Sequence, residues 1–335
     1  DALQRIQYAW THRGEEIAAQ ADQLTAFLKN ASNAVQVSSL SAFEKQDIIL
    51  AQNKLLQLGD KESGGFGSAP KFPGIMSIQF LLEAYKLTHD EVALQHAVFS
   101  IDALLCGGIY DCLGSGLCRY TVDKAWLIPH FEKMLYDNAL LISVLCDAYT
   151  VTKNEVYKTV IDDLIKFANR ELKGDHDLYY CAIDADSEGE EGAYYCWTYD
   201  ELKELLNKEE MAFAEKHLDV SEKGNWEGKN IIHVDELMLL SKEHEVFSLI
   251  RHKLFESRSK RIRPLTDDKA LLSWNALFNW SLVKAGKVLQ NNLYLDVAEA
   301  NMNAIIDLFN IAGTPGHVYK NGQLKHQINL DDYVF

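Results

Sequence analysis

The sequence has no basic cluster and no long apolar run, and each absence excludes a class of protein. Its 49 acidic residues outnumber the 33 basic ones, which gives a formal net charge of −16, and the densest basic stretch is only SKRIR at 259–263. We expect no nucleic-acid partner, because such binding depends on neutralising phosphates with Lys and Arg. No apolar run reaches the ~18–20 residues that span a bilayer, so we expect no membrane partner either.

Paired cysteines and frequent prolines are also missing, and we expect no leader sequence. The six cysteines stand singly, and neither a C-x-x-C pair nor a zinc-type histidine spacing occurs. We therefore expect no metal, no cofactor and reduced thiols in a cytoplasmic protein. The first residues, DALQRIQYAWTHRGEE, lack the pattern of a signal peptide. With only five prolines and no low-complexity stretch, nothing resembles an interdomain linker, and a single domain over 1–335 is expected.

Most of the sequence has apolar residues at helical spacing. The segments predicted to be helical are 3–30, 77–88, 90–105, 131–151, 154–172, 243–260, 268–289 and 292–309. Short strand-like segments lie between them, including GHVYKNGQLKH with its Asn-Gly turn. The helices come in pairs, and HFEKMLYDNAL (130–140) resembles DDKALLSWNAL (267–277). This pattern predicts an all-α fold, an α/α toroid of helical hairpins with short β-hairpin loops, whose inner helices point their first turns at a central funnel.

Three charged side chains mark the start of the predicted helix 131–151. His130, Lys133 and Asp137 recur at i, i+3 and i+7, so on a helix they would form one stripe at the funnel rim. A carboxylate raises the pKa of a neighbouring histidine and an ammonium lowers it, which is how a general acid or base is tuned. Helix capping is the competing interpretation, but cations are poorly placed at a helix N-terminus.

Four further acidic residues lie in other segments that are expected to face the funnel. Asp184 and Asp186 lie in DADSEGEEG, which starts like an EF-hand loop but has Tyr195 where the bidentate glutamate belongs. The loop either delivers carboxylates to the funnel or is a solvated turn. Asp268 and Asp332 stand at further helix starts, where N-capping is the alternative explanation. Together with Asp137 these four are the candidate acids and bases, since glycoside hydrolysis requires a pair of carboxyl groups.

Aromatic residues accompany these acids. Flat rings beside carboxylates suit sugars, whose C–H faces pack on aromatic rings while hydroxyls bind acids. Each ring taken singly is explained as well by burial in the core. The candidate substrate-binding residues are Phe66, Tyr110, Arg119, Trp126, Trp274, Asn275 and Tyr333.

Six motifs extend the interpretation to a family. They are GGFGSAPKFP (64–73), GGIYDCLGSGLCRYTVDKAWLIPHFEKMLYDNALL (107–141), DADSEGEEGAYYCW (184–197), GNWEGKNIIH (224–233), RPLTDDKALLSWNAL (263–277) and LDDYVF (330–335). In this order they resemble the thioredoxin-domain-containing proteins related to spermatogenesis-associated protein 20, a family of unknown function. The resemblance implies an (α/α)6 barrel like that of six-hairpin glycosidases and N-acylglucosamine 2-epimerases, which follows a thioredoxin-like domain in full-length relatives.

Two departures from that family are expected to matter. We expect the thioredoxin-like domain to be absent and at least one C-terminal hairpin to be missing, which would leave the toroid incomplete. Cys118 stands in LCRY, where the family usually has histidine. If that histidine takes part in chemistry, this copy is impaired.

The function expected from these features is carbohydrate chemistry by acid and base in the funnel, on a sugar-like ligand. A glycoside hydrolase would use two of the acids, whereas an N-acylglucosamine 2-epimerase-like enzyme would depend on His130 as base. The alternative from another class is a non-catalytic binding or scaffolding module that serves the thioredoxin-like domain. A third is a fragment without function, whose uncovered apolar flank would make it self-associate.

Overall fold

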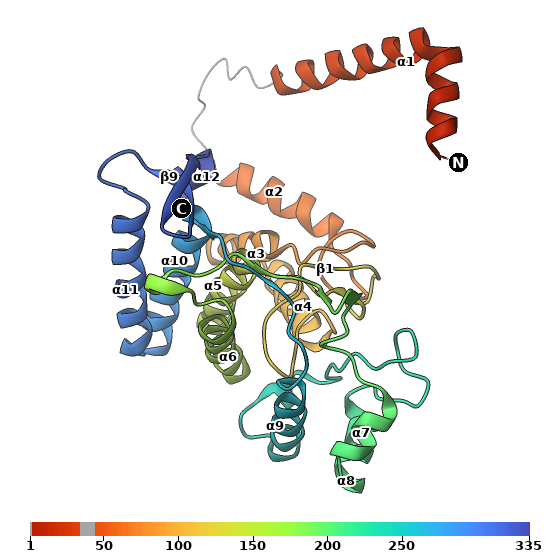
Figure 1. Cartoon of the computed structure of the whole chain (residues 1–335). Helices are drawn as coiled ribbons and strands as arrows, with labels where there is room; N and C mark the ends of the chain where they lie inside the picture. Colours follow the sequence, from red (N-terminus) through yellow and green to blue (C-terminus); the bar gives the residue numbers. More distant parts are fainter. Residues whose placement is uncertain (1, 34–43) are drawn as a thin grey trace. The chain divides into compact units, whose positions relative to one another are not determined.

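The computed structural model describes residues 2–33 and 44–335. The chain divides into two compact units, residues 1–47 and residues 48–335. The first contains helix α1 (Ala2–Asn33), whose backbone departs from helical geometry at Arg13 (φ −137°, ψ 24°) (Figure 1). Helix α2 (Lys45–Leu58) spans the boundary in the sequence, and every other element lies in the second unit.

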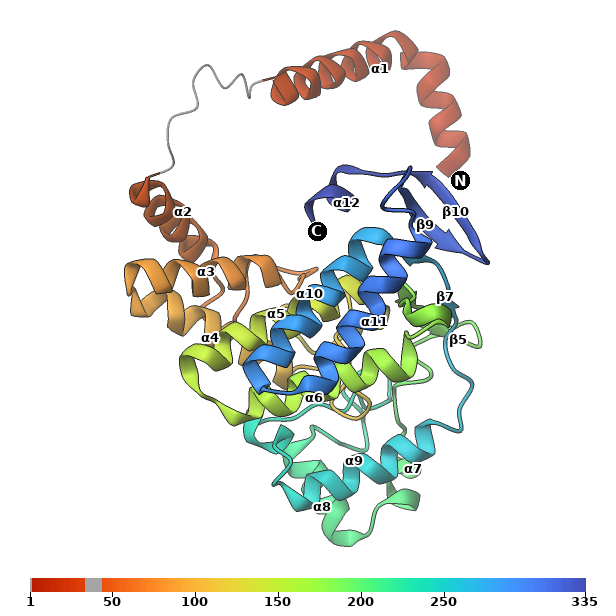
Figure 2. The same cartoon turned by 90° about the vertical axis from the view of Figure 1, so that its left-hand side faces the viewer.

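Three helical hairpins form the body of the second unit. They are α3 (Ile75–Thr88) with α4 (Glu91–Cys106), α5 (Leu135–Thr152) with α6 (Glu155–Glu171), and α10 (Leu272–Leu289) with α11 (Asn292–Leu308). The first helix of each pair packs beside its counterparts, α3 on α5 and α5 on α10. The second helices lie on the outside of this row (Figure 2). The predicted all-α fold of an α/α toroid, with an inner and an outer layer of hairpins, is confirmed.

The three hairpins turn in the same way. The first helix ends at a residue in the left-handed conformation: His89 (φ 56°), Lys153 (φ 60°) or Gln290 (φ 53°). The next residue is Asp90, Asn154 or Asn291, and its side chain accepts a hydrogen bond from the backbone N–H two positions later. A left-handed C-cap followed at once by an Asp or Asn N-cap reverses the chain in two residues.

Helix α5 is the most enclosed helix of the layer because α3, α6 and α10 all pack against it. Its buried residues run around the helix and include the polar Asn138, Ser143 and Asp147. Helix α6 has a polar outer face and buries one apolar stripe, as an outer helix should. These helices share one large apolar core, and two smaller clusters lie around Phe309 and Phe131.

The inner helices α5 and α10 begin at Leu135 and Leu272, not at the predicted 131 and 268. The residues before them are extended, as strands β3 (Lys133–Met134) and β8 (Ala270–Leu271). The helical prediction for these first residues is therefore wrong. The prediction extended the helical apolar spacing into residues whose backbone forms hydrogen bonds with other strands.

A pair of buried asparagines explains the repeated NAL motif. Asn138 and Asn275 are each the fourth residue of their helix. The Asn138 carboxamide accepts from Leu117 N–H (2.8 Å) and donates to the Leu117 carbonyl (3.3 Å). Asn275 holds the Tyr179 backbone in the same way, at 2.8 and 3.0 Å. Each inner helix is thus clamped to an extended segment that would otherwise bury unpaired backbone groups.

Short antiparallel strands join the loops at the starts of the inner helices. β1 (Tyr120–Thr121) pairs with β2 (Pro129–His130), and β5 (Asp186–Ser187) with β6 (Glu190–Glu191). β3 pairs with β4 (Ala182–Ile183), which pairs with β7 (Thr266–Asp267). β8 pairs with β9 (Gly316–Lys320), which pairs with β10 (Gln323–Gln327) through the predicted Asn321-Gly322 turn. Both turn residues have positive φ, 51° and 72°, as an Asn-Gly hairpin requires.

The long insertion between α6 and α10 forms short helices that the apolar spacing did not predict. These elements are η1 (Asp175–Asp177), α7 (Tyr199–Leu205), α8 (Lys208–His217) and η2 (Leu237–Leu240), followed by the predicted α9 (Glu245–Arg258). The short helix α12 (Leu330–Val334) ends the chain. Among the described residues, no helix is both long and apolar enough to cross a membrane.

Candidate functional site

The segment PHFEKM, residues 129–134, is extended, so its side chains alternate between two faces. His130 and Glu132 lie together on one face, with Nε2 and Oε2 3.6 Å apart. Phe131 and Lys133 are buried on the other, and both contact Tyr195. The predicted stripe of His130, Lys133 and Asp137 is therefore wrong. A strand repeats every two residues, which places the lysine opposite the histidine.

A group of charged and polar side chains gathers where α5 begins, and we call it the Asp137 cluster. Its members are Arg119, His130, Glu132, Tyr136, Asp137 and Glu191. Arg119 Nη1 donates to Glu132 Oε2 (3.0 Å). His130 Nδ1 lies 2.6 Å from Glu191 Oε1. Segments far apart in the sequence thus meet at one place.

Asp137 has the most unusual environment of the cluster. It lies in the first turn of α5 with only 7% of its surface exposed, and its Oδ2 has no hydrogen-bond partner among the described residues. Burial raises the pKa of the Asp137 carboxyl to about 7, against the opposing effects of Tyr136 and Arg119, and Glu132 raises it further. A carboxyl poised near neutrality can both give and take a proton, as general acid–base catalysis requires.

Arg119 provides the positive charge of the cluster. Its pairing with Glu132 raises its pKa, although burial opposes this. Its Nε is buried and makes no hydrogen bond with any described residue. Among the described residues, the cluster therefore contains one unpaired donor, Arg119 Nε, and one unpaired acceptor, Asp137 Oδ2. Buried polar groups normally have a hydrogen-bond partner.

Aromatic rings border the cluster. Tyr120 stacks on the His130 ring with centroids 5.0 Å apart, and Phe72 lies 5.0 Å from Tyr120. From the next inner helix, Trp274 contacts Tyr136 at 4.8 Å. The predicted substrate-binding residues Arg119 and Trp274 are thus both brought to the cluster.

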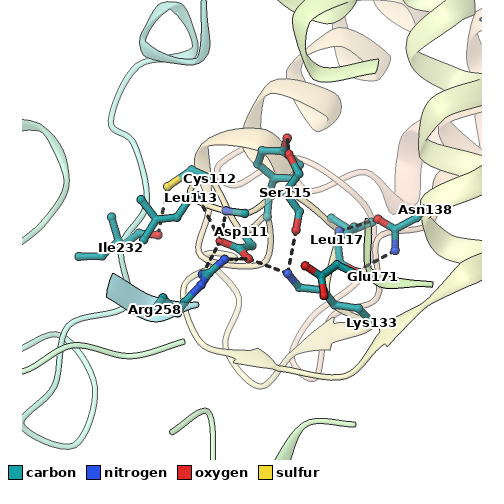
Figure 3. A network of polar contacts seen from close by, with 12 residues as sticks. Asp111, Cys112, Leu113, Ser115, Leu117, Lys133, Asn138, Glu171, Ile232 and Arg258 are labelled. Atoms are coloured by element: carbon teal, nitrogen blue, oxygen red, sulfur yellow. Dashed lines mark hydrogen bonds and ion pairs between the residues drawn. The ribbon is translucent and has the colours of Figure 1, made fainter. Parts of the chain in front are cut away.

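Lys133 belongs instead to a buried charge network with Asp111, Arg258 and Ser115 (Figure 3). Lys133 Nζ donates to Asp111 Oδ2 (2.7 Å) and to the Ser115 carbonyl (2.8 Å). Both Arg258 Nη atoms donate to the two oxygens of Asp111, at 2.9 and 2.8 Å. Lys133, Asp111 and Arg258 are almost completely buried.

Electrostatic interactions within this network keep Asp111 ionised. Burial opposes the ionisation of Asp111, but Arg258 and Lys133 outweigh it and hold the pKa of this carboxyl far below its usual range. Burial lowers the pKa of Lys133, against the pull of Asp111. Asp111 also accepts from the N–H groups of Leu113 and Gly114. This geometry gives Lys133 a structural role, because it ties strand β3, which leads into α5, to the 111–115 turn.

The acidic loop reaches the cluster through Glu191, which was not among the predicted site residues. Asp184 and Asp186 are exposed, and Asp184 Oδ1 accepts from the Asp186 N–H (3.3 Å). Glu191, the cross-strand partner of Asp186, is the residue that reaches His130. Asp184 and Asp186, which were predicted as candidate acids, therefore lie outside the cluster, as the solvated-turn alternative expected.

The other two predicted acids have partners outside the cluster. Asp268 forms an ion pair with Lys320. The side chain of Asp332 is fully buried: Oδ1 accepts from Ser273 N–H (3.0 Å) and Oδ2 lies 2.7 Å from His317 Nδ1. Asp332 thereby binds the first turn of α10. Its Oδ2 also accepts from the Asn329 N–H (2.7 Å) in the capping box of its own helix α12, which was the alternative explanation for it. Tyr333 beside it is 74% exposed.

The remaining predicted binding residues are structural in this geometry. Tyr110 is buried and its hydroxyl lies 3.0 Å from Ser115 Oγ. Trp126 is buried, and its indole N–H donates to the Ser63 carbonyl (2.7 Å). Phe66 packs edge-on against His96. Asn275 has both ends of its carboxamide occupied by the Tyr179 backbone.

Three members of the cluster were missed from the sequence: Glu132, Tyr136 and Glu191. The alternation of PHFEKM was the available signal for Glu132, since period two pairs it with His130. Glu191 carried no signal of its own, because its contact depends on how the 184–192 hairpin folds back. The described residues contain no group of three or more His, Cys, Asp or Glu side chains placed to hold a metal ion.

The chain is homologous to spermatogenesis-associated protein 20. It is 34% identical to the protein of Rattus norvegicus over 268 residues, which are 69% of this chain and 34% of that protein. The human protein is 32% identical over 277 residues, 71% of this chain and 35% of the relative. An uncharacterized protein of Caenorhabditis elegans is 29% identical over 338 residues, 89% of this chain and 45% of the relative. The chain thus spans about a third to a half of the curated relatives that it matches, and no protein-family model matches it.

Solved structures with a similar succession of helical hairpins include sugar-modifying enzymes. A sugar epimerase from a ruminal bacterium has a TM-score of 0.38 at 13% identity, with 84% of this chain and 76% of that one covered. The cellobiose 2-epimerase of Bacillus thermoamylovorans has a TM-score of 0.39 at 15% identity, with the same coverage. A family 76 glycoside hydrolase (mannosidase) of Bacteroides thetaiotaomicron has a TM-score of 0.39 at 12% identity, covering 71% of this chain and 43% of that one.

Proposed function

We propose that the Asp137 cluster is an acid–base site for a sugar-like ligand. The observation that carries the proposal is the Asp137 carboxyl itself, which is buried, has an unpartnered oxygen and has a pKa raised to about 7. Perturbed carboxyl groups of this kind are typical of functional sites. A purely structural acid would be expected to have its partners in place, as Asp111 and Asp332 do.

Two groups of the cluster are suited to opposite proton transfers. Protonated Asp137 donates to an oxygen of the ligand, and His130, whose Nδ1 is held by Glu191, accepts a proton through Nε2. In an open-chain sugar, removal of the proton beside a carbonyl while that oxygen is protonated gives an enediol, and reprotonation at carbon gives the epimer. In a glycoside, Asp137 would protonate the leaving oxygen, and Glu132 or Glu191 would activate water.

The aromatic border and Arg119 suit the same ligand. The faces of Trp274 and Tyr120 provide packing for a sugar ring, and the unpaired Arg119 Nε provides a donor for a hydroxyl. Three types of contact, a protonatable acid, a guanidinium and aromatic faces, are thus available within one cluster.

The test is a titration with a panel of neutral mono- and disaccharides, followed by tryptophan fluorescence and by chromatography of the products. We expect saturable binding that Asp137→Asn abolishes, together with either epimer or hydrolysis product from the wild type. Asp200→Asn is the matched control, because Asp200 is also an acid in a helix first turn but lies exposed on α7. Trp274→Phe should remove most of the fluorescence change while ligand is still bound.

Absence of binding across the panel, with folded wild type, would overturn this proposal. It would favour the non-catalytic module that serves a thioredoxin-like domain in full-length relatives. Binding that Asp137→Asn and Asp200→Asn weaken equally would also contradict it, because the site would then lie elsewhere.

A further inference from the structure

A pocket lies between the outer helix α6 and helix α9 of the insertion, and it is separate from the Asp137 cluster. Its volume is about 280 Å³. We call it the cationic pocket, and its polar lining includes Asp163, Lys166, Arg170, Ser248, Arg251 and His252. None of these residues belongs to the Asp137 cluster.

The charge of this lining is opposite to that of the chain. Lys166, Arg170 and Arg251 line the pocket with the single acid Asp163. Just outside the lining, Asp162 pairs with Lys166 and Glu171 with Arg170. The chain as a whole carries −16. A lining with more cations than acids in an acidic protein is a place where a small anion can bind.

The two guanidinium groups are held in position before any ligand arrives. Arg170 Nη2 donates to the Gly114 carbonyl (2.6 Å), and its guanidinium lies over the Phe255 ring at 4.8 Å. Arg251 Nε donates to the Leu113 carbonyl (3.0 Å) and Nη1 to Asp163 (2.5 Å). Groups that are already oriented lose little conformational freedom when a ligand binds.

Unused donors remain in the lining. Among the described residues, Arg170 Nη1 and the Ser248 hydroxyl make no hydrogen bond. Lys166 is paired only with Asp162 at the surface, with 62% of its side chain exposed. A ligand that brings several acceptor oxygens would find donors from both helices.

We propose that the cationic pocket binds a phosphate group, either of free phosphate or of a phosphorylated small molecule. A phosphate presents several charged oxygens, which match guanidinium, ammonium and hydroxyl donors. The pocket is larger than a phosphate, so a small organic group attached to it has room. A neutral sugar would not use the charge of these donors, and a nucleic acid would need a basic stripe that this surface lacks.

Calorimetric titration of the full chain at constant ionic strength tests the proposal, with inorganic phosphate, glucose 6-phosphate and glucose as probes. We expect both phosphate compounds to bind and glucose not to bind at this pocket. Tighter binding of glucose 6-phosphate would identify a phosphorylated metabolite as the source, and equal binding would identify free phosphate. Lys166→Glu and, separately, Ser248→Glu should each weaken phosphate binding roughly tenfold by repelling the anion.

Lys158→Glu is the matched control. Lys158 is also on α6 and also forms an ion pair one turn away, with Glu155, but it does not line the pocket. Its phosphate affinity should equal that of the wild type, and so should that of Asp137→Asn, which separates this proposal from the acid–base site. Two results would overturn the proposal: no phosphate binding by the wild type, or equal weakening by Lys166→Glu and Lys158→Glu in proteins with native circular dichroism.

Discussion

The Asp137 cluster and the buried charge network draw side chains from opposite faces of the same six residues, 129–134, yet they differ in how their charges are matched. In the network, Asp111 is surrounded by Arg258, Lys133 and backbone N–H groups, so every oxygen is used. In the cluster, Asp137 retains an oxygen without a partner. The comparison teaches that burial with matched partners fixes a charge, whereas burial without them leaves a proton free to move.

Removing a partner from the network should have the largest effect on stability. Arg258→Met leaves Asp111 buried with less compensation, and we expect it to lower the free energy of unfolding by about 3–5 kcal/mol. Urea unfolding followed by circular dichroism measures this. Arg13→Met, which breaks an exposed Arg–Glu pair, is the control and should change nothing measurable. A small loss in Arg258→Met would show that the network does not stabilise the fold.

Between about pH 4 and pH 7, stability should fall as the pH rises because Asp137 must lose its proton. Its pKa is raised from 3.8 to about 7 by burial, so the folded state binds its proton more tightly than the unfolded state does. Stability from this group is therefore present below about pH 4 and is lost as pH rises to about 7, by about 2–4 kcal/mol.

Asp137→Asn should remove this loss and be more stable than the wild type at pH 8, with little difference at pH 4. Urea unfolding at both pH values compares the two proteins, with Asp200→Asn as control. Parallel stability profiles for wild type and Asp137→Asn would contradict the raised pKa.

The next largest effect on stability is expected at two buried asparagines, Asn138 and Asn275. Asn138→Ala and Asn275→Ala each leave a buried backbone N–H and C=O unpaired, and we expect a loss of about 1–3 kcal/mol for either. Thermal unfolding compares them with Asn292→Ala, an exposed asparagine at the start of α11. If only one of the pair is sensitive, the two inner helices are not equivalent as the repeated motif implies.

The smallest effect is expected at the edge of the cluster. Glu191→Gln keeps an acceptor near His130 but removes the charge, so the free energy of unfolding should change by less than about 1 kcal/mol. Binding of any saccharide found in the panel should weaken by about threefold, because the histidine is held less firmly. Unchanged affinity would place Glu191 outside the functional part of the cluster.

The sequence predicted the hairpins well because their signals are local. The apolar spacing of α3 to α6, α10 and α11 and the Asn321-Gly322 turn depend on neighbouring residues alone. The starts of α5 and α10 were misjudged because strands β3 and β8 are fixed by partners far along the chain, which periodicity does not reveal.

The site was predicted only in part for the same reason. Four of the predicted residues, Asp137, His130, Arg119 and Trp274, lie together in the structure, and all four belong to motifs that the sequence analysis singled out. Lys133 and Asp332 look like functional charges in the sequence, and only the tertiary structure reveals the partners that occupy them. Glu191 was missed, because a solvated turn and a contact with His130 have the same local pattern.

The titration of the Asp137 carboxyl, followed by carbon NMR of labelled aspartate with Asp137→Asn to assign the signal, tests the central claim most directly. The account predicts a midpoint near pH 7 that moves when a bound saccharide is added. A midpoint near pH 4, the same with and without saccharide, would contradict it.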